Sequence, residues 1–276
     1  MLELNDEQIE LLRFFSPTAM WVRRERPFER AFTSSKGRKT TIMDELAPLI
    51  DKIKSPVLPK GKNWSDDMPL LEKGIKLNEE IMPEISPLAH VLITQFAKKK
   101  KIYPSRVSAA RPKKIGILCH EMSVSDIASK LAHEGGHLCN HGRSRYLTRE
   151  NTPFAMEGLA SNKLGEIGHP SQLHAAQVVG NIANTTEAYY KLIVSLGYGT
   201  KYNRISDEFA HDLRYFIASL ASAPGVKQIN DGHISVEDTF RINDYSAMDF
   251  FKKAKITPES TLECNREFIE TLERGL

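Results

Sequence analysis

The 276-residue chain is poor in cysteine and has no long apolar run. Its three cysteines, Cys119, Cys139 and Cys264, are spaced like neither a disulfide framework nor a zinc knuckle, which favours a reducing compartment. We expect Cys139 to be a small apolar residue rather than a ligand. No apolar stretch approaches the roughly 18 residues of a transmembrane helix, so we expect no membrane span.

The chain also lacks a strong charge imbalance, with a formal net charge of +3. That excess is too small to imply nucleic-acid binding. The basic run Lys98–Lys101 is typical of a solvated surface, and no aromatic residues alternate with it as they do in single-strand binders. We therefore expect no nucleic-acid partner. The start of the chain, Met1 to Glu7, is acidic and unlike a secretory signal, which predicts a cytoplasmic protein.

The most informative motif is His133-Glu134-Gly135-Gly136-His137, an HExxH sequence. Two histidines four residues apart on a helix lie about 5–6 Å apart on one face and can bind one metal ion. The intervening glutamate lies beside that ion without occupying a coordination position. Glu134 is therefore the candidate general base that takes a proton from water.

The sequence around the motif predicts the helix that the motif needs. Ser123 and Ser125 are N-cap candidates, and apolar residues recur at helical spacing from Ile127 onward. Gly135 and Gly136 should cost this helix about 2 kcal/mol relative to alanines. Metal binding can offset that cost, and the glycines would also let a neighbouring backbone come close.

Residues 115–160 resemble the gluzincin metallopeptidases, which carry HExxH on one helix and a glutamate ligand on the next. Glu157 follows His137 by twenty residues, a thermolysin-like spacing, and opens the phrase Glu-Gly-Leu-Ala. The resemblance implies a zinc ion held by His133, His137 and Glu157, with a fourth position open for water. Ser161 stands where the thermolysin-like pattern has aspartate, so the partner of the first histidine must come from elsewhere.

Other third ligands are less favoured by the sequence. His141 lies two helical turns from His133, about 12 Å along the axis, which is too far to share an ion. The position of a metzincin-type third histidine is Arg143. We expect Glu150 to be solvated in the loop before Pro153, and Glu166 to lie at a helix end.

A peptidase also needs a donor for the oxyanion that forms during hydrolysis. Tyr146 and His211 are the two candidates. A histidine beside Asp212 on a helix is often structural, and Tyr215, one turn later, is as good a candidate as His211.

The predicted fold class is mainly α, an α+β fold with a zincin-like core: a small sheet and an active-site helix surrounded by additional helices. Helices are expected from a capping box at Asn5 to Pro17, and at 41–54, 70–82, 86–97, 172–182, 186–196, 207–221, 236–241, 245–254 and 258–274. Strands are expected at 102–103, 105–108 and 115–119, the last with an edge free to pair with a peptide substrate. A proline-rich loop near residue 60 suggests an N-terminal helical segment, 1–60, and a metallopeptidase domain, 61–276.

Two functions follow from this pattern. The first is a zinc metallopeptidase that cleaves peptide bonds of a protein or peptide substrate; the second is a helical protein-binding module with a coincidental or structural metal site. The last helix carries an acidic face similar to the glutamate-rich signals of bacterial secreted effectors, which would allow translocation into another cell; plain solvation is the simpler interpretation. Substrate specificity and oligomeric state leave no readable pattern.

Overall fold

The computed structural model describes the backbone of residues 1–54, 63–111, 113–139, 146–197, 204–242 and 248–276. Within these ranges the chain is mainly helical with three small sheets, in agreement with the predicted class. No helix among the described residues is long and apolar enough to cross a membrane.

The first helix, α1 (Asp6–Glu25), begins at the predicted capping box, in which Asn5 and Gln8 exchange side-chain and backbone hydrogen bonds. It does not end at Pro17, as the sequence predicts, but continues for two more turns. Thr18, Ala19 and Val22 are buried there, and this packing offsets the backbone bond that proline cannot make.

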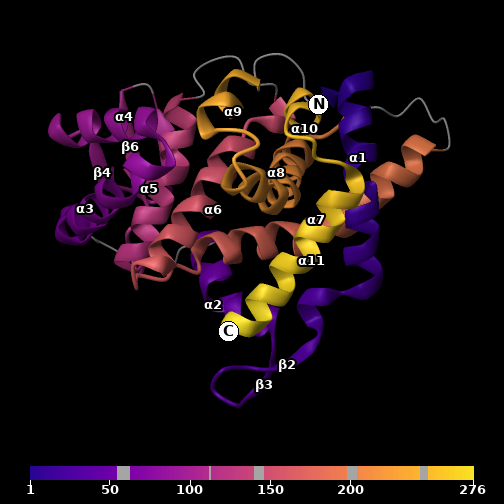
Figure 1. Ribbon diagram of the computed structural model, residues 1–276, viewed down its shortest axis with the longest axis horizontal. Coiled ribbons are helices and arrows are strands. Elements are labelled where there is room, and N and C mark those ends of the chain that lie inside the picture. The colour runs from indigo at the N-terminus through magenta and orange to yellow at the C-terminus, as the bar shows by residue number, and fades with distance from the viewer. Residues whose placement is uncertain (55–62, 112, 140–145, 198–203, 243–247) are drawn as a thin grey trace.

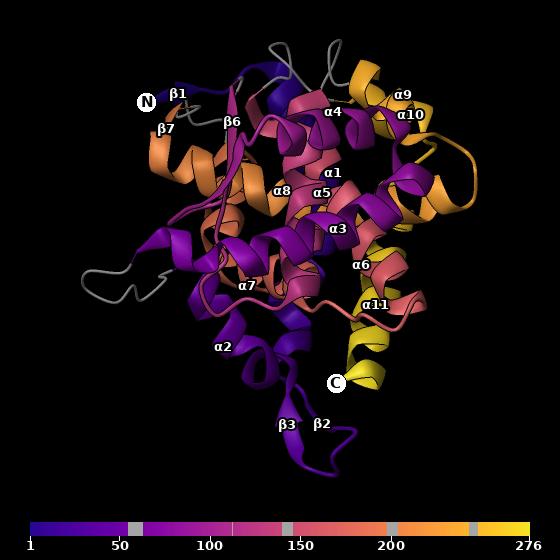
Figure 2. The ribbon, with the colours of Figure 1, turned by 90° about the vertical axis from the view of Figure 1, so that its left-hand side faces the viewer.

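A hairpin follows α1 in the arginine-rich stretch that the sequence predicts to be a polar connection. After a short 3-10 turn (Pro27–Glu29), β2 (Ala31–Thr33) pairs antiparallel with β3 (Lys39–Thr41). Figures 1 and 2 both show this hairpin projecting from the body of the protein. The next helix, α2 (Ile42–Lys54), lies within the predicted range and packs against the later helix α7 (Leu173–Gly197).

A small three-stranded sheet precedes the HExxH helix, after α3 (Met68–Ile85) and α4 (Pro87–Lys98). Its order is β4 (Ile102–Pro104), β6 (Lys114–Ile117), β5 (Ala109–Arg111), with β6 parallel to β4 and antiparallel to β5. The prediction of a free edge on the strand before the HExxH helix is therefore wrong, because β6 is the central strand. The edge strands of this sheet are β4 and β5. β5 lies just after the strand predicted at 105–108.

The HExxH motif lies on α5 (Val124–Cys139), and the following short 3-10 turn (Tyr146–Thr148) leads to α6 (Asn151–Glu166). Ser123 caps α5, as predicted: its hydroxyl accepts from the Asp126 amide at 3.0 Å, and Asp126 accepts from the Ser123 hydroxyl at 2.7 Å. Almost all of α5 is buried, between α3 and α4 on one side and α6 on the other.

The C-terminal part is more continuous than the sequence predicts. Residues 173–197 form one helix, α7, where two are expected, and α8 (Asp207–Asn230) continues through Pro224. The chain ends with α9 (Val236–Ile242), α10 (Asp249–Lys253) and α11 (Pro258–Gly275). A short antiparallel pair joins β1 (Leu2–Glu3) to β7 (Arg204–Ile205). In Figure 1, α1 and α11 lie together, as their contacts also show.

Two hydrophobic clusters fill the interior. One joins α1 and α2 to α7, α8, α10 and α11; the other lies among α3, α4, the three-stranded sheet, α5 and α6. Residues 1–54 thus share a core with the last third of the chain, and the predicted division near residue 60 stays a prediction. The candidate site lies where α5 and α6, from the second cluster, meet α7 and α8 from the first.

The acidic face of α11 is exposed at Glu259, Glu263, Glu267 and Glu270. The opposite face buries Thr261, Cys264, Asn265 and Ile269. Lys227 lies 3.6 Å from Glu267, and Arg274 lies 3.3 Å from Glu270. These contacts agree with a solvated face, and the resemblance to a secretion signal stays a prediction.

The two glycines of the motif face different neighbours. A Cβ on Gly136 would lie 2.8 Å from the Cα of Pro153, in the backbone of α6, whereas a Cβ on Gly135 would meet the Cδ1 of Ile93 at 2.8 Å. The expected close approach of a neighbouring backbone is confirmed at Gly136. The helix is formed through both glycines, up to Cys139.

We predict that Gly136→Ala destabilises the protein and Gly135→Ala does not. Overpacking against backbone costs about 1–3 kcal/mol, while each alanine recovers about 1 kcal/mol of helix propensity. The end of the Ile93 side chain can rotate away, but Pro153 cannot move without moving α6. Urea denaturation of both variants measures the difference, and equal stabilities would show that the α5–α6 crossing is not tight.

Candidate metal centre

The two histidines of α5 lie side by side, with ring centroids 5.0 Å apart. His133 is buried and His137 is partly buried. Helical spacing explains this arrangement, because residues four apart lie on one face. Both Nε2 atoms point to the same carboxylate, which comes from the chain segment just before α6.

That carboxylate is Glu150. Its Oε2 lies 3.1 Å from Nε2 of His137 and 3.5 Å from Nε2 of His133. Among the described histidines, cysteines, aspartates and glutamates, these three residues are the group whose ligand atoms all lie within 4.8 Å of one another. The prediction that Glu150 is solvated is wrong, since only 2% of the residue is exposed.

Glu157 lies on the other side of the first histidine. It is fully buried in α6, and its Oε2 is 2.7 Å from Nδ1 of His133. The Nζ of Lys130 is 3.8 Å from the same oxygen, and Nδ1 of His174 is 3.9 Å from Oε1. Glu157 as a metal ligand stays a prediction; the group that could hold an ion contains Glu150, whereas Glu157 lies beside Nδ1 of His133.

Ser161, which stands where the thermolysin-like pattern has aspartate, does not contact His133 but Ser129. Ser161 lies one turn after Glu157, and its hydroxyl is 3.0 Å from that of Ser129. The sequence predicts that the partner of His133 is not residue 161. The structure agrees, because the carboxylate beside Nδ1 of His133 is that of Glu157. A carboxylate behind a ligating imidazole fixes its orientation and raises its basicity.

The pKa shifts agree with strong coupling between these groups. Burial and Lys130 lower the pKa of His133, but Glu150 and Glu157 outweigh them and raise it. Burial raises the pKa of the Glu150 carboxyl, but the two imidazoles hold it well below its usual range. The same competition, with Lys130 and His133 prevailing over burial, lowers the pKa of Glu157 to about 2.

A cation fits between the three ligand atoms. Nδ1 of His133 and Oε2 of Glu157 lie 2.7 Å apart without hydrogen-bond geometry. A proton on Nδ1 would leave a lone pair on Nε2 facing the carboxylate of Glu150. The Oε2 atoms of Glu150 and Glu134 are buried and accept no hydrogen bond from the described residues. Lone pairs that face each other in a buried space repel, so either an extra proton or a shared cation must lie there. Two imidazoles and a carboxylate are the donor set of many catalytic zinc sites.

The Glu150 carboxylate is held from α8. Nε of the buried Arg214 lies 3.5 Å from Oε1 of Glu150, leaving Oε2 toward the histidines. The ring of Tyr215 lies against Phe154, with centroids 6.0 Å apart, and Phe154 packs on His133 at 5.4 Å. Burial and the carboxylates of Glu150 and Glu134 raise the pKa of Tyr215, which places its hydroxyl in the field of the site.

The remaining predicted residues are placed as follows. Glu134 is buried, with 2% of the residue exposed. His211 is exposed, lies 3.7 Å from Asp212 and packs on the ring of Tyr215 at 4.9 Å. The backbone of Tyr146 begins the 3-10 turn before α6, and its side chain lies outside the described part of the structure, as do His141 and Arg143.

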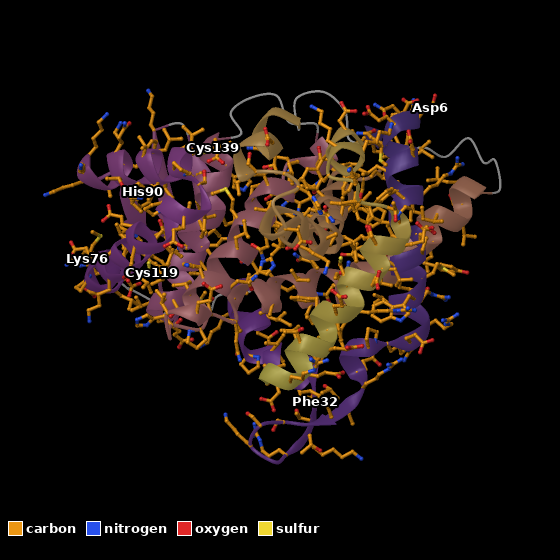
Figure 3. All side chains as sticks on the ribbon, in the orientation of Figure 1. Asp6, Phe32, Lys76, His90, Cys119 and Cys139 are labelled. Carbon is orange, nitrogen blue, oxygen red and sulfur yellow. The ribbon has the colours of Figure 1, made fainter. Side chains whose placement is uncertain are left out.

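The cysteines take no part in the three-residue group. Cys119 and Cys139, labelled in Figure 3, lie just before and at the end of α5, and none of the three cysteines forms a disulfide. Burial raises the pKa of Cys139 to about 12, so its sulfur is a neutral thiol at neutral pH. The expectation that Cys139 is a small apolar residue agrees with this environment.

A cavity of about 650 Å³ opens beside the site. It lies between the end of the three-stranded sheet and helices α2, α5, α7 and α8. Lys130 of α5 and Tyr215 and His211 of α8 are among its lining residues.

Comparison with known proteins adds no identification: no family model, no curated protein and no solved structure matches this chain.

We predict that Glu150→Gln weakens zinc binding more than Glu157→Gln. Loss of an orienting carboxylate typically costs about 10–100-fold in metal affinity, and loss of a charged ligand should exceed about 100-fold. Titration of metal-free protein with zinc against a competing chelator measures both affinities. Glu166→Gln, at the exposed end of α6, is the control.

The opposite order of affinities would assign the ligand position to Glu157. Absence of zinc binding by the wild-type chain would contradict the metal site itself.

Proposed function

We propose that this protein is a zinc-dependent peptide hydrolase in which His133, His137 and Glu150 hold the ion. The observation that supports this most directly is the convergence of three ligand atoms, from two buried residues and the partly buried His137, with a second buried carboxylate, Glu134, on the helix of the two histidines. When bound, zinc would polarise the scissile carbonyl and acidify a water molecule.

Glu134 is suited to take up a proton. Its Oε2 accepts no hydrogen bond from the described residues, and its position between the two histidines keeps it near the ion without making it part of the three-residue group. A carboxylate with an unused oxygen beside the attacking water accepts its proton and can pass it to the leaving amine.

Two residues of α8, Arg214 and Tyr215, would assist the reaction. Arg214 fixes Glu150, and the phenol of Tyr215 lies in the field of Glu150 and Glu134. Since its raised pKa keeps this phenol protonated at neutral pH, Tyr215 is the better oxyanion donor of the candidates on α8. His211 is exposed, and its ring packs on that of Tyr215 with centroids 4.9 Å apart.

An extended substrate would pair with β5. This strand is an edge of the sheet, and its neighbours before and after the β5–β6 hairpin, Ser108 and Leu118, line the cavity. Strand addition at such an edge uses backbone hydrogen bonds and leaves alternate side chains to enter pockets. The proposed setting is cytoplasmic.

We predict that Glu134→Gln retains zinc and the fold but loses about 10²–10⁴-fold in hydrolysis, because proton transfer contributes that much. His137→Ala should lose zinc and thermal stability together, because the ligand set is broken. New amino termini in a cell lysate or peptide library, compared between wild type and Glu134→Gln, measure the activity and reveal the substrate.

Equal cleavage by wild type and Glu134→Gln, or cleavage by neither over a wide range of peptides and pH, would contradict the proposal. With zinc binding intact, that result would favour a binding module with a structural metal.

A further inference from the structure

The cavity beside the metal centre has cationic groups at its mouth. Lys54, the last residue of α2, and Arg106, which precedes β5, both line it and are exposed. They come from different elements, α2 and the connection between β4 and β5. Lys130, from α5, lies deeper, with only 15% of its side chain exposed.

The charges in this cavity are unequal. Its lining holds three cationic side chains and one carboxylate, Asp212. Lys130 is engaged by the buried Glu157 at 3.8 Å. Among the described residues no carboxylate lies within 4.0 Å of the charged nitrogens of Lys54 or Arg106, although Asp212 is close enough to act on Lys54 through the field.

Lys54 is partly taken out of water. Its Nζ donates to the carbonyl of Gly180 at 3.4 Å, and burial lowers its pKa despite the opposing effect of Asp212. A cation with incomplete hydration and no paired carboxylate gains from an incoming anion, because the pair replaces hydration that has already been lost.

The rest of the lining suits a side chain with an apolar stem. Ile50, Leu118, Met122 and Leu173 form apolar walls, while Asn181 and Asn184 add amide groups. A volume near 650 Å³ is in the usual range for a ligand pocket, about 300–1,000 Å³. It has room for one or two side chains of a peptide.

Two residues that line the cavity, Lys130 and Tyr215, also lie near residues of the metal centre. Lys130 precedes Glu134 by one helical turn, on the same face of α5. Tyr215 lines the cavity and lies in the field of Glu150 and Glu134. We infer from these two residues that a peptide bound with its scissile bond at the ligands would extend a neighbouring side chain toward the cavity.

We propose that this cavity is a specificity pocket for an aspartate or glutamate side chain close to the scissile bond, with Lys54 and Arg106 as the residues that recognise the carboxylate. The proposal rests on the proposed peptide hydrolase and adds the class of substrate: acidic peptide segments.

The test uses the zinc-loaded Glu134→Gln protein, which should bind peptides without cleaving them. It is incubated with a pool of random heptapeptides, and the retained peptides are sequenced. We expect enrichment of Asp and Glu at one position. Adding Lys54→Gln and Arg106→Gln to this background should reduce that enrichment by roughly tenfold, since each partly exposed charge pair is worth about two- to fivefold.

The matched control carries Lys52→Gln and Lys113→Gln in the same background. These residues belong to the same two regions of the chain but do not line the cavity. All substituted side chains are cationic and at the surface, so thermal denaturation should show unchanged folding in both proteins. Loss of acidic enrichment in the control as well would point to a general charge effect and overturn the pocket.

The outcomes separate the two proposals. Selective retention of acidic peptides, with no cleavage of those peptides by wild type, supports the pocket and contradicts the hydrolase. Cleavage by wild type with no acidic preference, unchanged by Lys54→Gln and Arg106→Gln, supports the hydrolase and overturns the pocket. Retention of no peptide class above background also overturns the pocket.

Discussion

Gly136 of α5 lies directly against the backbone of Pro153 in α6, with no side chain between them. This crossing brings the start of α6 over the HExxH helix, and both carboxylates that contact the histidines come from that region. Glu150 stands just before the first residue of α6, and Glu157 lies on the helix itself. Because the two oxygens approach His133 from opposite ring nitrogens, a shift of α6 by even a fraction of an ångström would alter both contacts.

The crossing of α5 and α6 buries polar groups, and their burial costs free energy. A buried acceptor without a hydrogen bond costs about 1–3 kcal/mol, and Glu134, Glu150 and Glu157, on or beside the crossing helices, each carry at least one. Such a cluster is unfavourable for a structural core and is common where a ligand completes the set. Arg214, on α8, holds one oxygen of Glu150, so α5, α6 and α8 all contribute to one set of charges.

The sequence predicted the elements of this site better than their mutual arrangement. The HExxH spacing and the Ser123 cap are local features, and the structure has them within one helix. Glu150 was missed because a polar residue before a proline normally indicates a solvated turn, whereas here tertiary packing buries it. The glycine that permits a close crossing and Pro153 near the start of the next helix were the available signal. The thermolysin-like spacing directed attention to Glu157, whose contact is with Nδ1. The sequence predicts that the first helix ends at Pro17 and that the helix at 207–221 stops before Pro224, but the buried residues around each proline carry both helices through it.

The chemistry of Cys139 has a consequence for the durability of such a centre. Its thiol follows His137 by two residues, yet burial keeps it protonated at neutral pH. Peroxide attacks thiolates, and oxidation of cysteine ligands is the usual way in which zinc is released under oxidative stress. A set of two imidazoles and a carboxylate offers no sulfur to oxidise. A metal centre built this way would keep its ion under oxidising conditions that strip zinc from thiolate sites.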